Sequence, residues 1–256
     1  MLPEQRRRKI LDLIQHSGAV DVTVLSGSLS VSGATIRRDL RDLEARGMLS
    51  RTHGGAVANL VSTSFEPIYS DKSRERREEK AVIAVYACDF VRDGEVVVLD
   101  SGSTTFALAR ELKRQLRDLT IITTDLQIAV ELCDTPGFDV ILTGGTVRPQ
   151  LYSVVGPMAE DALAGLHANH TFIGADAVDL DAGVTNANLE EVGVKRRVMS
   201  VAEQAILLVD HTKFGKAGLA RIAPLTSFDA VVVDAGLDEG TAQLYREAGI
   251  DLRLAR

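Results

Sequence analysis

The chain contains 256 residues, of which 45% are hydrophobic, so it can bury a substantial core, and its length fits one mid-sized domain plus a small one. A net charge of −7 argues against a uniformly basic nucleic-acid-binding protein, but the charge is divided unevenly. Residues 1–58 carry 9 Lys and Arg and 6 Asp and Glu, net +3, whereas the remaining residues carry 20 and 30, net −10. The sequence therefore predicts a local basic surface near the N-terminus.

Several classes of protein are disfavoured by what the sequence lacks. Cys88 and Cys133 lie far apart with no CxxC or paired His spacing, so neither a disulfide framework nor a zinc site is indicated. No apolar run reaches the roughly 20 residues that span a bilayer, and the N-terminus continues into a charged helix rather than a signal segment. We therefore expect a cytoplasmic protein with no metal, no cofactor and no membrane partner.

The first 31 residues predict two helices. Residues 5–16 place apolar side chains on one helical face behind a basic run, and Gly18 stops that helix. Residues 22–29 predict a short second helix, and residues 30–31 a tight turn. This order is that of a helix-turn-helix whose third helix would follow directly.

The third helix is the stretch on which the functional hypothesis depends. Ser32 is a good N-cap, and Ile36, Leu40 and Leu43 recur at helical spacing to form a narrow apolar stripe. The opposite side and flanks are small or cationic: Ala34, Thr35, Arg37, Arg38 and Arg41. The first turns of such a helix fit a major groove, where Arg pairs with guanine, although a basic helical face is also typical of plain solvation.

A small wing is expected after this helix. Gly47 is placed as a C-cap, and residues 48–57 predict a hairpin with a basic Arg51-Thr52-His53 segment and a Gly54-Gly55 turn. Arg51 would then reach DNA phosphates. We predict a winged helix-turn-helix over residues 1–57. Its DNA-contacting residues would be Ser32, Ala34, Thr35, Arg37, Arg38, Arg41, Arg51 and His53.

Residues 58–80 form a polar connector with Pro67 and the charge run KSRERREEK. No buried face is evident, so we expect a solvated linker or an exposed helix. Its mixed charges suit i,i+4 pairs such as Arg74 with Glu78, each worth a few tenths of a kcal/mol.

Residues 81–256 alternate short apolar runs with helical segments. Strands are predicted at 96–99, 119–123, 138–142, 171–173, 205–209 and 230–233, and helices at 82–91, 105–112, 125–132, 193–202 and 241–248. Fully apolar strands alternating with helices indicate an α/β domain whose mostly parallel sheet is covered on both faces. In such sheets ligands bind at the carboxyl ends of the strands.

Two loops at predicted strand ends are glycine-rich. The loop 100–105, DSGSTT, joins a strand to a helix, and its glycine, hydroxyls and helix N-terminus suit a phosphate. The alternative is that Ser103 or Thr104 merely caps the helix. Gly144-Gly145 follows another strand, although such a pair is by itself only a turn. No Walker or GxGxxG motif is present, so nucleotide hydrolysis and dinucleotide binding are unsupported.

Two further segments carry charges near predicted strand ends. Glu191 and Lys195 stand at i,i+4, where a surface ion pair worth roughly 0.3 to 0.5 kcal/mol is the simplest interpretation. Lys213 follows the strand AILLV; a lone Lys is usually solvated, but at the carboxyl end of a strand it suits an anion.

The motifs resemble one family throughout most of the chain. The run VSxxTIRRDLxxLExxGxLxRxHGGA and the later segments DSGSTT, LTGGTVR, VVGPMAE, FIGADAVD, GVTNANLEE and VDHTKFGK are similar to bacterial transcriptional regulators of the DeoR type. The resemblance implies a C-terminal sensor domain with a fold similar to sugar-phosphate isomerases. It also supports a connector that transmits subunit geometry between the two domains.

The resemblance also implies roles for individual residues. An effector phosphate would be held by Ser101, Gly102, Ser103, Thr104 and Thr105. The sugar side would be lined by Asp100, Asp176, Glu191, Lys195 and Lys213, to which the strand-end pair Gly144 and Gly145 is added.

The chain departs from the family pattern at four positions. In the second helix it has Ser26 and Gly27, and Gly27 should cost about 1 kcal/mol of helix propensity relative to Ala. Asp125 stands where many relatives have Asn, and Ala177 where they often have Gly. A carboxylate at 125 would repel phosphate if it faced the pocket, or it would simply be an N-cap.

We therefore predict a repressor of sugar-catabolism genes whose operator binding is modulated by a phosphorylated sugar. Its partners would be double-stranded operator DNA, the effector and further copies of the chain, as a homodimer or homotetramer. The alternative is an isomerase-like enzyme using Asp100 or Glu191 as a base beside Lys195. Such enzymes do not need residues 1–57, which favours the regulator.

Overall fold

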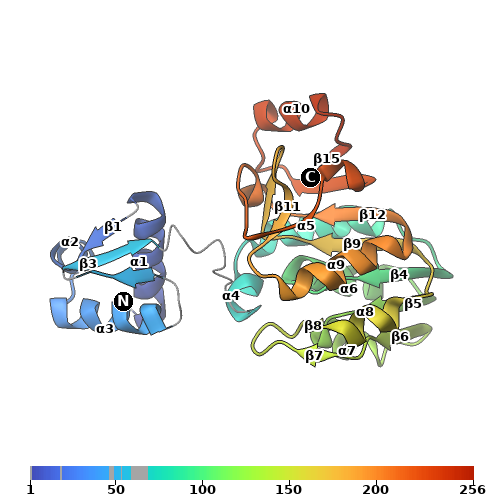
Figure 1. Cartoon of the computed structure of the whole chain (residues 1–256), viewed down its shortest axis with the longest axis horizontal. Coiled ribbons are helices and arrows are strands. Elements are labelled where there is room, and N and C mark those ends of the chain that lie inside the picture. The colour runs from blue at the N-terminus through green and yellow to red at the C-terminus, as the bar shows by residue number, and fades with distance from the viewer. Residues whose placement is uncertain (1, 18, 46–48, 53, 59–68) are drawn as a thin grey trace. The chain divides into compact units, whose positions relative to one another are not determined.

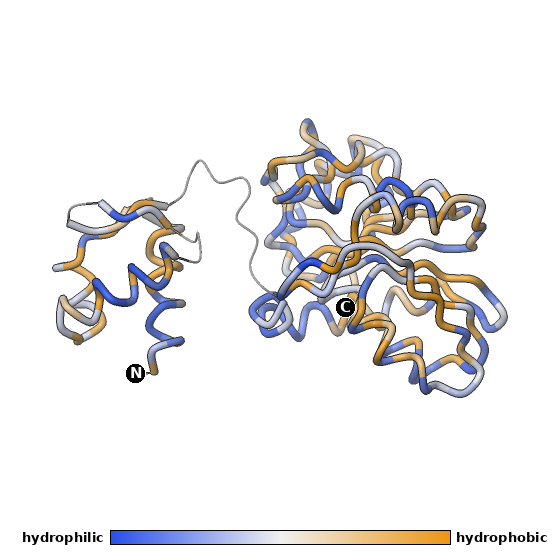
Figure 2. The backbone as a smooth tube through the Cα atoms, turned by 60° about the horizontal axis from the view of Figure 1, so that its bottom comes forward, coloured by the Kyte–Doolittle hydropathy of each residue, from blue (hydrophilic) through white to orange (hydrophobic). Residues whose placement is uncertain are grey.

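The structure is a computed structural model that describes residues 2–17, 19–45, 49–52, 54–58 and 69–256. The chain divides into two compact units, Met1–Phe65 and Glu66–Arg256 (Figure 1). Along both units hydrophobic and hydrophilic stretches alternate (Figure 2), as expected for elements that each bury one face. Each unit is described separately below.

The N-terminal unit is a winged helix-turn-helix. Ile10, Leu25, Ile36, Leu40 and Leu43 bring its three helices together in one buried core. The predicted second helix, 22–29, is found at those bounds. The elements are α1 (Pro3–Ser17), β1 (Ala19–Asp21), α2 (Val22–Leu29), α3 (Gly33–Ala45), β2 (Leu49–Arg51) and β3 (Gly55–Ala58).

Strand β1 was not predicted, and it enlarges the wing to three strands in the order β1-β3-β2. It is only three residues long, too short to give a periodicity signal, and Asp21 at its end caps α2 by accepting from the backbone N–H of Thr23 at 2.6 Å. The close approach explains the Gly54-Gly55 pair, because a Cβ on Gly55 would lie 1.9 Å from the carbonyl oxygen of Val20.

The second unit contains a fully parallel seven-stranded sheet in the order β15-β14-β12-β9-β4-β5-β6. Alternate residues of each strand enter two separate cores. Val97 and Leu99 pack with α5, α6 and α7, whereas Val98 lies on the other face, in the core to which α8, α9 and α10 contribute. The predicted α/β architecture, with helices on both faces, is confirmed (Figure 1).

The helices and 3-10 turns of this unit are α4 (Tyr69–Arg74), α5 (Arg77–Cys88), α6 (Ser103–Gln115), α7 (Leu126–Leu132), α8 (Pro157–Leu163), α9 (Glu190–Ser200), η1 (His211–Lys213), η2 (Leu225–Ser227) and α10 (Glu239–Glu247). Its strands are β4 (Glu95–Leu99), β5 (Leu119–Thr123), β6 (Phe138–Leu142), β7 (Thr146–Val147), β8 (Val154–Val155), β9 (Ala168–Gly174), β10 (Ala177–Asp179), β11 (Gly183–Asn186), β12 (Ala202–Leu208), β13 (Ala220–Ala223), β14 (Ala230–Asp234) and β15 (Leu252–Ala255).

The sequence did not predict the small antiparallel sheet β10-β11-β13, the pair β7-β8, helix α8 or the edge strand β15. Most of these elements have two to four residues, so hydrophobic periodicity does not reveal them. Ala177, one of the departures from the family pattern, lies buried at the start of β10 and pairs with Thr185 of β11.

The expectation of an unburied connector is wrong for its C-terminal part. Residues 69–74 and 77–88 are helices α4 and α5, and Tyr69 and Lys80 are buried. The chain turns sharply at Arg76, whose φ is +51°, so Arg74 and Glu78 do not belong to one helix. The guanidinium of Arg76 instead lies 3.4 Å from the carboxylate of Glu79 in the first turn of α5.

Candidate DNA-binding surface and effector pocket

Helix α3 presents a polar face beside a buried one. Ile36, Leu40 and Leu43 are at most 1% exposed and fix the helix on α1 and α2. Ala34, Arg37, Arg38 and Arg41 are exposed, and Thr35 is half-buried. The predicted reading face is therefore accessible, which is the geometric requirement for major-groove contact.

Ser32 caps α3 as predicted. Its hydroxyl accepts from the backbone N–H of Thr35 at 3.2 Å and lies 2.9 Å from the Thr35 hydroxyl. The two predicted contacts Ser32 and Thr35 are thus tied to each other at the helix N-terminus, where backbone N–H groups favour a DNA phosphate.

Arg51 is positioned by the end of α3 rather than left free. Its backbone N–H donates to Glu44 at 3.1 Å and its guanidinium lies 3.5 Å from the same carboxylate. Both side chains are about one-third or more exposed, so the pair is weak and its guanidinium is available to a stronger anion such as a phosphate. His53 and Gly47, also singled out from the sequence, lie outside the described residues.

Two arginines of the N-terminal basic run form ion pairs within the N-terminal unit, and the sequence did not predict these pairs. Arg6 is buried and donates to Asp39 of α3 at 2.5 Å and 3.2 Å. Arg7 reaches the same carboxylate at 3.3 Å and Asp42 at 2.7 Å. The aspartate of the RRDL motif therefore orients α3 on α1, and these two arginines are engaged within the unit.

The predicted effector residues gather where the central strands end. Strands β12, β9, β4 and β5 are neighbours and parallel, so their carboxyl ends lie at one edge of the sheet. Asp100 follows β4 and Asp176 follows β9, while Lys213 follows β12 in η1. Helix α9 adds Glu191 and Lys195, and both are buried.

The loop 101–105 has the form expected of a phosphate site. Gly102 has φ of +150° and stands at the N-terminus of the 13-residue helix α6, with no side-chain cap among the described residues. The capping role considered for Ser103 or Thr104 is therefore absent there. The first intrahelical bond runs from the N–H of Phe106 to Gly102 at 2.9 Å, so the N–H groups of residues 103–105 precede it and favour an anion.

The expected surface pair between Glu191 and Lys195 is replaced by buried interactions. The Lys195 ammonium donates to Asp100 and, at 3.0 Å, to the carbonyl of Gly174. Burial lowers the pKa of Lys195, but Asp100 and Glu191 outweigh it and raise that pKa above its ordinary value. Lys195 is therefore a fixed cation at the strand ends. Sequence spacing within α9 suggested the wrong partner because Asp100 is 95 residues away.

Glu191 is held by three donors, two from the loop between β7 and β8 and one from β11. Its carboxylate accepts from Ser153 at 2.7 Å, Arg148 at 2.8 Å and Asn186 at 2.8 Å. Burial raises the pKa of Glu191, but Lys195 and its other partners lower it below its ordinary value. A carboxylate fixed in this way accepts hydroxyl hydrogen bonds well.

Asp176 is partnered by Lys72, which the sequence did not single out. The Lys72 ammonium lies 2.9 Å from one carboxylate oxygen, and the N–H of Ala187 donates to the other at 2.9 Å. Burial raises the pKa of Asp176, but Lys72 and these bonds together lower it to about 2, and Lys213 contributes. The half-buried Lys213 is thus electrostatically coupled to the pocket.

Asp125 is the N-cap of α7, one of the two alternatives that the sequence left open, and it also contacts the loop 101–105. One oxygen caps α7 by accepting from the N–H groups of Gln127 at 2.7 Å and Ile128 at 3.2 Å. The other accepts from the N–H of Gly102 at 3.2 Å, so the carboxylate contacts the phosphate loop. Burial raises the pKa of Asp125 to about 6.

Of the pair Gly144 and Gly145, only Gly145 is required sterically. A Cβ on Gly145, whose φ is +134°, would lie 2.7 Å from the carbonyl oxygen of Val155 and 3.2 Å from the Cβ of Ala159. The pair is exposed between β6 and β7. The turn interpretation accounts for these two residues, and their role on the sugar side stays a prediction.

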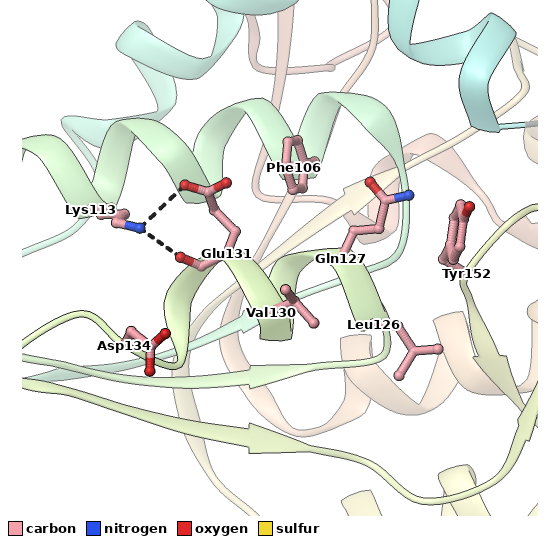
Figure 3. A pocket seen from close by; sticks show the side chains of 8 residues that line it. All are labelled: Phe106, Lys113, Leu126, Gln127, Val130, Glu131, Asp134 and Tyr152. Atoms are coloured by element: carbon pink, nitrogen blue, oxygen red, sulfur yellow. Dashed lines mark hydrogen bonds and ion pairs between the residues drawn. The ribbon is translucent and has the colours of Figure 1, made fainter.

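A separate hollow of about 670 Å³ lies on the α6–α7 side (Figure 3). It contains none of the predicted effector residues. Lys113 and Glu131 form an ion pair at its rim, at 3.3 Å. Its lining residues are Phe106, Lys113, Leu126, Gln127, Val130, Glu131, Asp134 and Tyr152.

Two further observations concern only the described ranges. Within them no three His, Cys, Asp or Glu side chains gather as metal ligands. Every helix there is too short or too polar to cross a bilayer.

Both units match known sequence families. The model of the DeoR-like helix-turn-helix domain matches residues 6–60, and that of the DeoR C terminal sensor domain matches residues 75–235. The chain is 36% identical over 252 residues to the HTH-type transcriptional regulator GlpR of Haloferax volcanii, covering 98% of this chain and 97% of that protein. It is 30% identical over 254 residues to the glycerol-3-phosphate regulon repressor of Escherichia coli, covering 99% and 100%.

Among solved structures, ribose 5-phosphate isomerase A of Methanocaldococcus jannaschii matches with a TM-score of 0.41 and 19% identity, over 55% of each chain. So low a similarity carries no information on activity. The full-length relatives are named regulators and repressors, so the isomerase alternative is rejected. The chain belongs to the DeoR family of DNA-binding transcriptional regulators.

Proposed function

We propose that this regulator is a repressor of sugar-catabolism genes whose affinity for its operator is modulated by a phosphorylated sugar. The observation that carries the proposal is the edge of the sheet at which the phosphate loop 101–105 meets buried, oppositely charged side chains. Such a site combines an anion-binding helix N-terminus with fixed donors and acceptors for hydroxyl groups.

The phosphate would bind at the start of α6. The N–H groups of residues 103–105 and the hydroxyls of Ser101, Ser103 and Thr104 are the donors available there, and the helix dipole adds positive potential. All five loop residues are at least partly shielded from solvent, and Thr105 is buried with its hydroxyl donating to Gly102 at 2.9 Å. Shielding strengthens the attraction for an anion.

The sugar hydroxyls would bind the fixed charges around the loop. Asp100, Asp176 and Glu191 offer acceptors, and Lys195 and Lys213 offer donors. Asp100 is paired with Lys195, and Asp176 and Glu191 are held by other side chains and backbone groups, so these four groups are preorganised and ligand binding orders few of them. The name of one relative, the glycerol-3-phosphate regulon repressor, is consistent with a small phosphorylated polyol as the chemical class.

DNA binding would be carried by α3 and the wing, with Ser32, Ala34, Thr35, Arg37, Arg38, Arg41, Arg51 and His53 as contacts. A helix-turn-helix head usually reads one half-site, so a homodimer or homotetramer would present two heads to a paired operator.

The test is operator binding followed by fluorescence polarisation at one fixed salt concentration, with a panel of pentose, hexose and glycerol phosphates and their unphosphorylated parents. Salt must be fixed because phosphate contacts make affinity salt-dependent. We expect one phosphorylated compound to change the operator Kd at least tenfold while its parent has no effect.

The matched variants are Ser103→Ala with Thr104→Ala, and Thr226→Ala with Ser227→Ala as the control. The control pair has the same chemistry but is exposed at η2, before β14 and away from the strand ends. The first double variant should bind operator normally and lose the response, and the control should keep it. Release of DNA by the loop variant at the wild-type dose would contradict the assignment of the phosphate site.

A further inference from the structure

The short helix α4 is the first described element of the second unit, and it is attached to the domain by Tyr69. The Tyr69 backbone N–H donates to Gln150 at 3.0 Å, and the side chain is only 6% exposed. Its ring stands edge-on to Phe106 of α6 at 6.2 Å and to Tyr152 at 5.6 Å between centroids. Phe106 and Tyr152 both line the hollow of Figure 3.

The second attachment of α4 is made by Lys72 in the candidate pocket. Its ammonium pairs with Asp176 at 2.9 Å, with 21% and 19% of the two side chains exposed. Its backbone carbonyl accepts from the buried ammonium of Lys80, which also donates to the carbonyl of Glu75 at 2.6 Å. The position of Lys72 is therefore fixed from α5 on one side and from the pocket on the other.

The positive charge of Lys72 acts on two acidic side chains of the candidate effector site. Burial raises the pKa of Asp176 and of Glu191, and Lys72 is among the groups that lower both again. One oxygen of Asp176 takes the Lys72 ammonium and the other takes the N–H of Ala187. A ligand hydroxyl that approaches the first oxygen from the side of Lys72 competes with that ammonium.

We propose that the Lys72–Asp176 ion pair is a latch through which occupancy of the effector pocket is passed to the segment leading to the DNA-binding unit. This inference rests on the proposed function. When a polyol phosphate enters, its hydroxyl takes the Asp176 oxygen and its negative charge draws the ammonium of Lys72 away. Helix α4 then loses its ion pair with the candidate site and keeps the attachment at Tyr69 and the bonds from Lys80.

The latch supplies the difference in affinity that allostery requires. A ligand shifts a two-state equilibrium only as far as its affinities for the two states differ. Here the latched state presents one Asp176 oxygen already paired with Lys72, whereas the unlatched state presents that oxygen without the ammonium. Coupling is reciprocal, so operator DNA should change the affinity of the effector by the same factor as the effector changes that of DNA.

The experiment uses the full-length protein and compares wild type with Lys72→Met, which keeps the length of the side chain and removes its charge. The control is Arg74→Met, which removes the same charge from an exposed position of the same helix. Asp176→Asn breaks the pair from the other side. Two quantities are measured: hydrogen exchange of the backbone amides of residues 69–80, and operator Kd without ligand.

We expect at least fivefold faster exchange in residues 69–80 for Lys72→Met and Asp176→Asn, and wild-type exchange for Arg74→Met. The operator Kd of the two latch variants should move in the direction in which a saturating sugar phosphate moves that of wild type. Wild-type exchange in Lys72→Met would overturn the latch. The latch also fails, and the proposed function stands, if a sugar phosphate changes operator binding and leaves exchange of residues 69–80 unaltered.

The experiment also recognises the opposite result, in which the proposed effector is wrong and the latch is right. If no sugar phosphate raises the thermal stability of wild type, but both latch variants exchange faster and change the operator Kd, the effector class is wrong and the coupling contact stands. If Asp176→Asn is too unstable to purify, the comparison of Lys72→Met with Arg74→Met decides alone.

Discussion

At the scale of single residues, Asp125 has the most specific effect on the loop 101–105 of the sensor domain. Where the resemblance to the family predicts an amide, this chain has a carboxylate, which caps α7 and also accepts from the N–H of Gly102. Burial and the nearby Asp100 oppose its ionisation. We therefore expect the contact between Asp125 and Gly102 to depend on pH.

The stability of the protein should report this directly. The pKa of Asp125 is raised from 3.8 to about 6, so the folded state holds the proton more tightly, and this group lowers the unfolding free energy as pH rises from about 4 to about 6. A difference in pKa of that size corresponds to roughly 3 kcal/mol of unfolding free energy. Asp125→Asn should remove that loss, so denaturation curves at pH 4.5 and 7 should diverge between the two proteins. If the unfolding free energies of wild type and Asp125→Asn changed with pH in the same way, the prediction would be contradicted.

Arg38 is the residue of the reading face on which the DNA-binding prediction rests most directly. It is exposed at the centre of the cationic side of α3. If Arg38 pairs with a base, Arg38→Ala should weaken operator binding by about 1 to 3 kcal/mol and relax the sequence preference. Arg110→Ala, an exposed arginine of α6, is the control. Polarisation titrations on operator and scrambled DNA check it; equal losses on both would assign Arg38 to phosphate contact instead.

At the scale of elements, the structure separates glycines that are needed from one that is not. A Cβ on Gly27 in α2 meets nothing within 4 Å, whereas one on Gly55 would collide with the backbone of β1. Gly27 lies inside the helix, where glycine costs backbone entropy without any return in packing.

Gly27→Ala should stabilise the N-terminal unit by about 1 kcal/mol, because alanine restores helix propensity at no steric cost. Hydrogen exchange of the buried amides of α2 in the full chain measures the change, with roughly fivefold slower exchange expected. Gly55→Ala provides the contrast and should speed exchange throughout the three-stranded wing. Unchanged protection in Gly27→Ala would show that α2 does not limit opening of this unit.

The aspartate of RRDL shows how one element depends on another. Asp39 is 1% exposed and pairs with Arg6 and Arg7 of α1. Removing one member of such a buried pair leaves an uncompensated charge, which is why α1 and α3 are coupled electrostatically as well as through their apolar core.

At the scale of the whole molecule, the chain separates into two units with separate cores. A protein lacking residues 1–65 should therefore fold, keep its response to sugar phosphates in thermal unfolding, and lose operator binding. Circular dichroism and calorimetry on this truncated chain test the prediction. Loss of the cooperative unfolding transition would show that the second unit depends on the first.

The strongest predictions from the sequence concerned long or repeated patterns. The sequence predicted the three helices of the N-terminal unit, the alternation of apolar strands with helices and the parallel sheet. Hydrophobic periodicity made this possible, because it indicates which face of an element is buried. Short elements such as β1 and β10 were missed. The partners of Glu191 and Lys195 were also missed, because a pair within one helix is visible in a sequence and a pair between distant strands is not.

The sequence by itself determined the family, the two-part organisation and the positions of the third helix and of the glycine-containing loop before α6, because these depend on local motifs and on hydrophobic periodicity. Only the tertiary structure decided which charges meet. Asp100 with Lys195, Asp176 with Lys72, and Asp125 with Gly102 are separated by 95, 104 and 23 residues. Parallel strands bring Asp100, Asp125 and Asp176, which follow β4, β5 and β9, to one edge whatever the length of chain between them, and α4 and α9 place Lys72 and Lys195 against that edge.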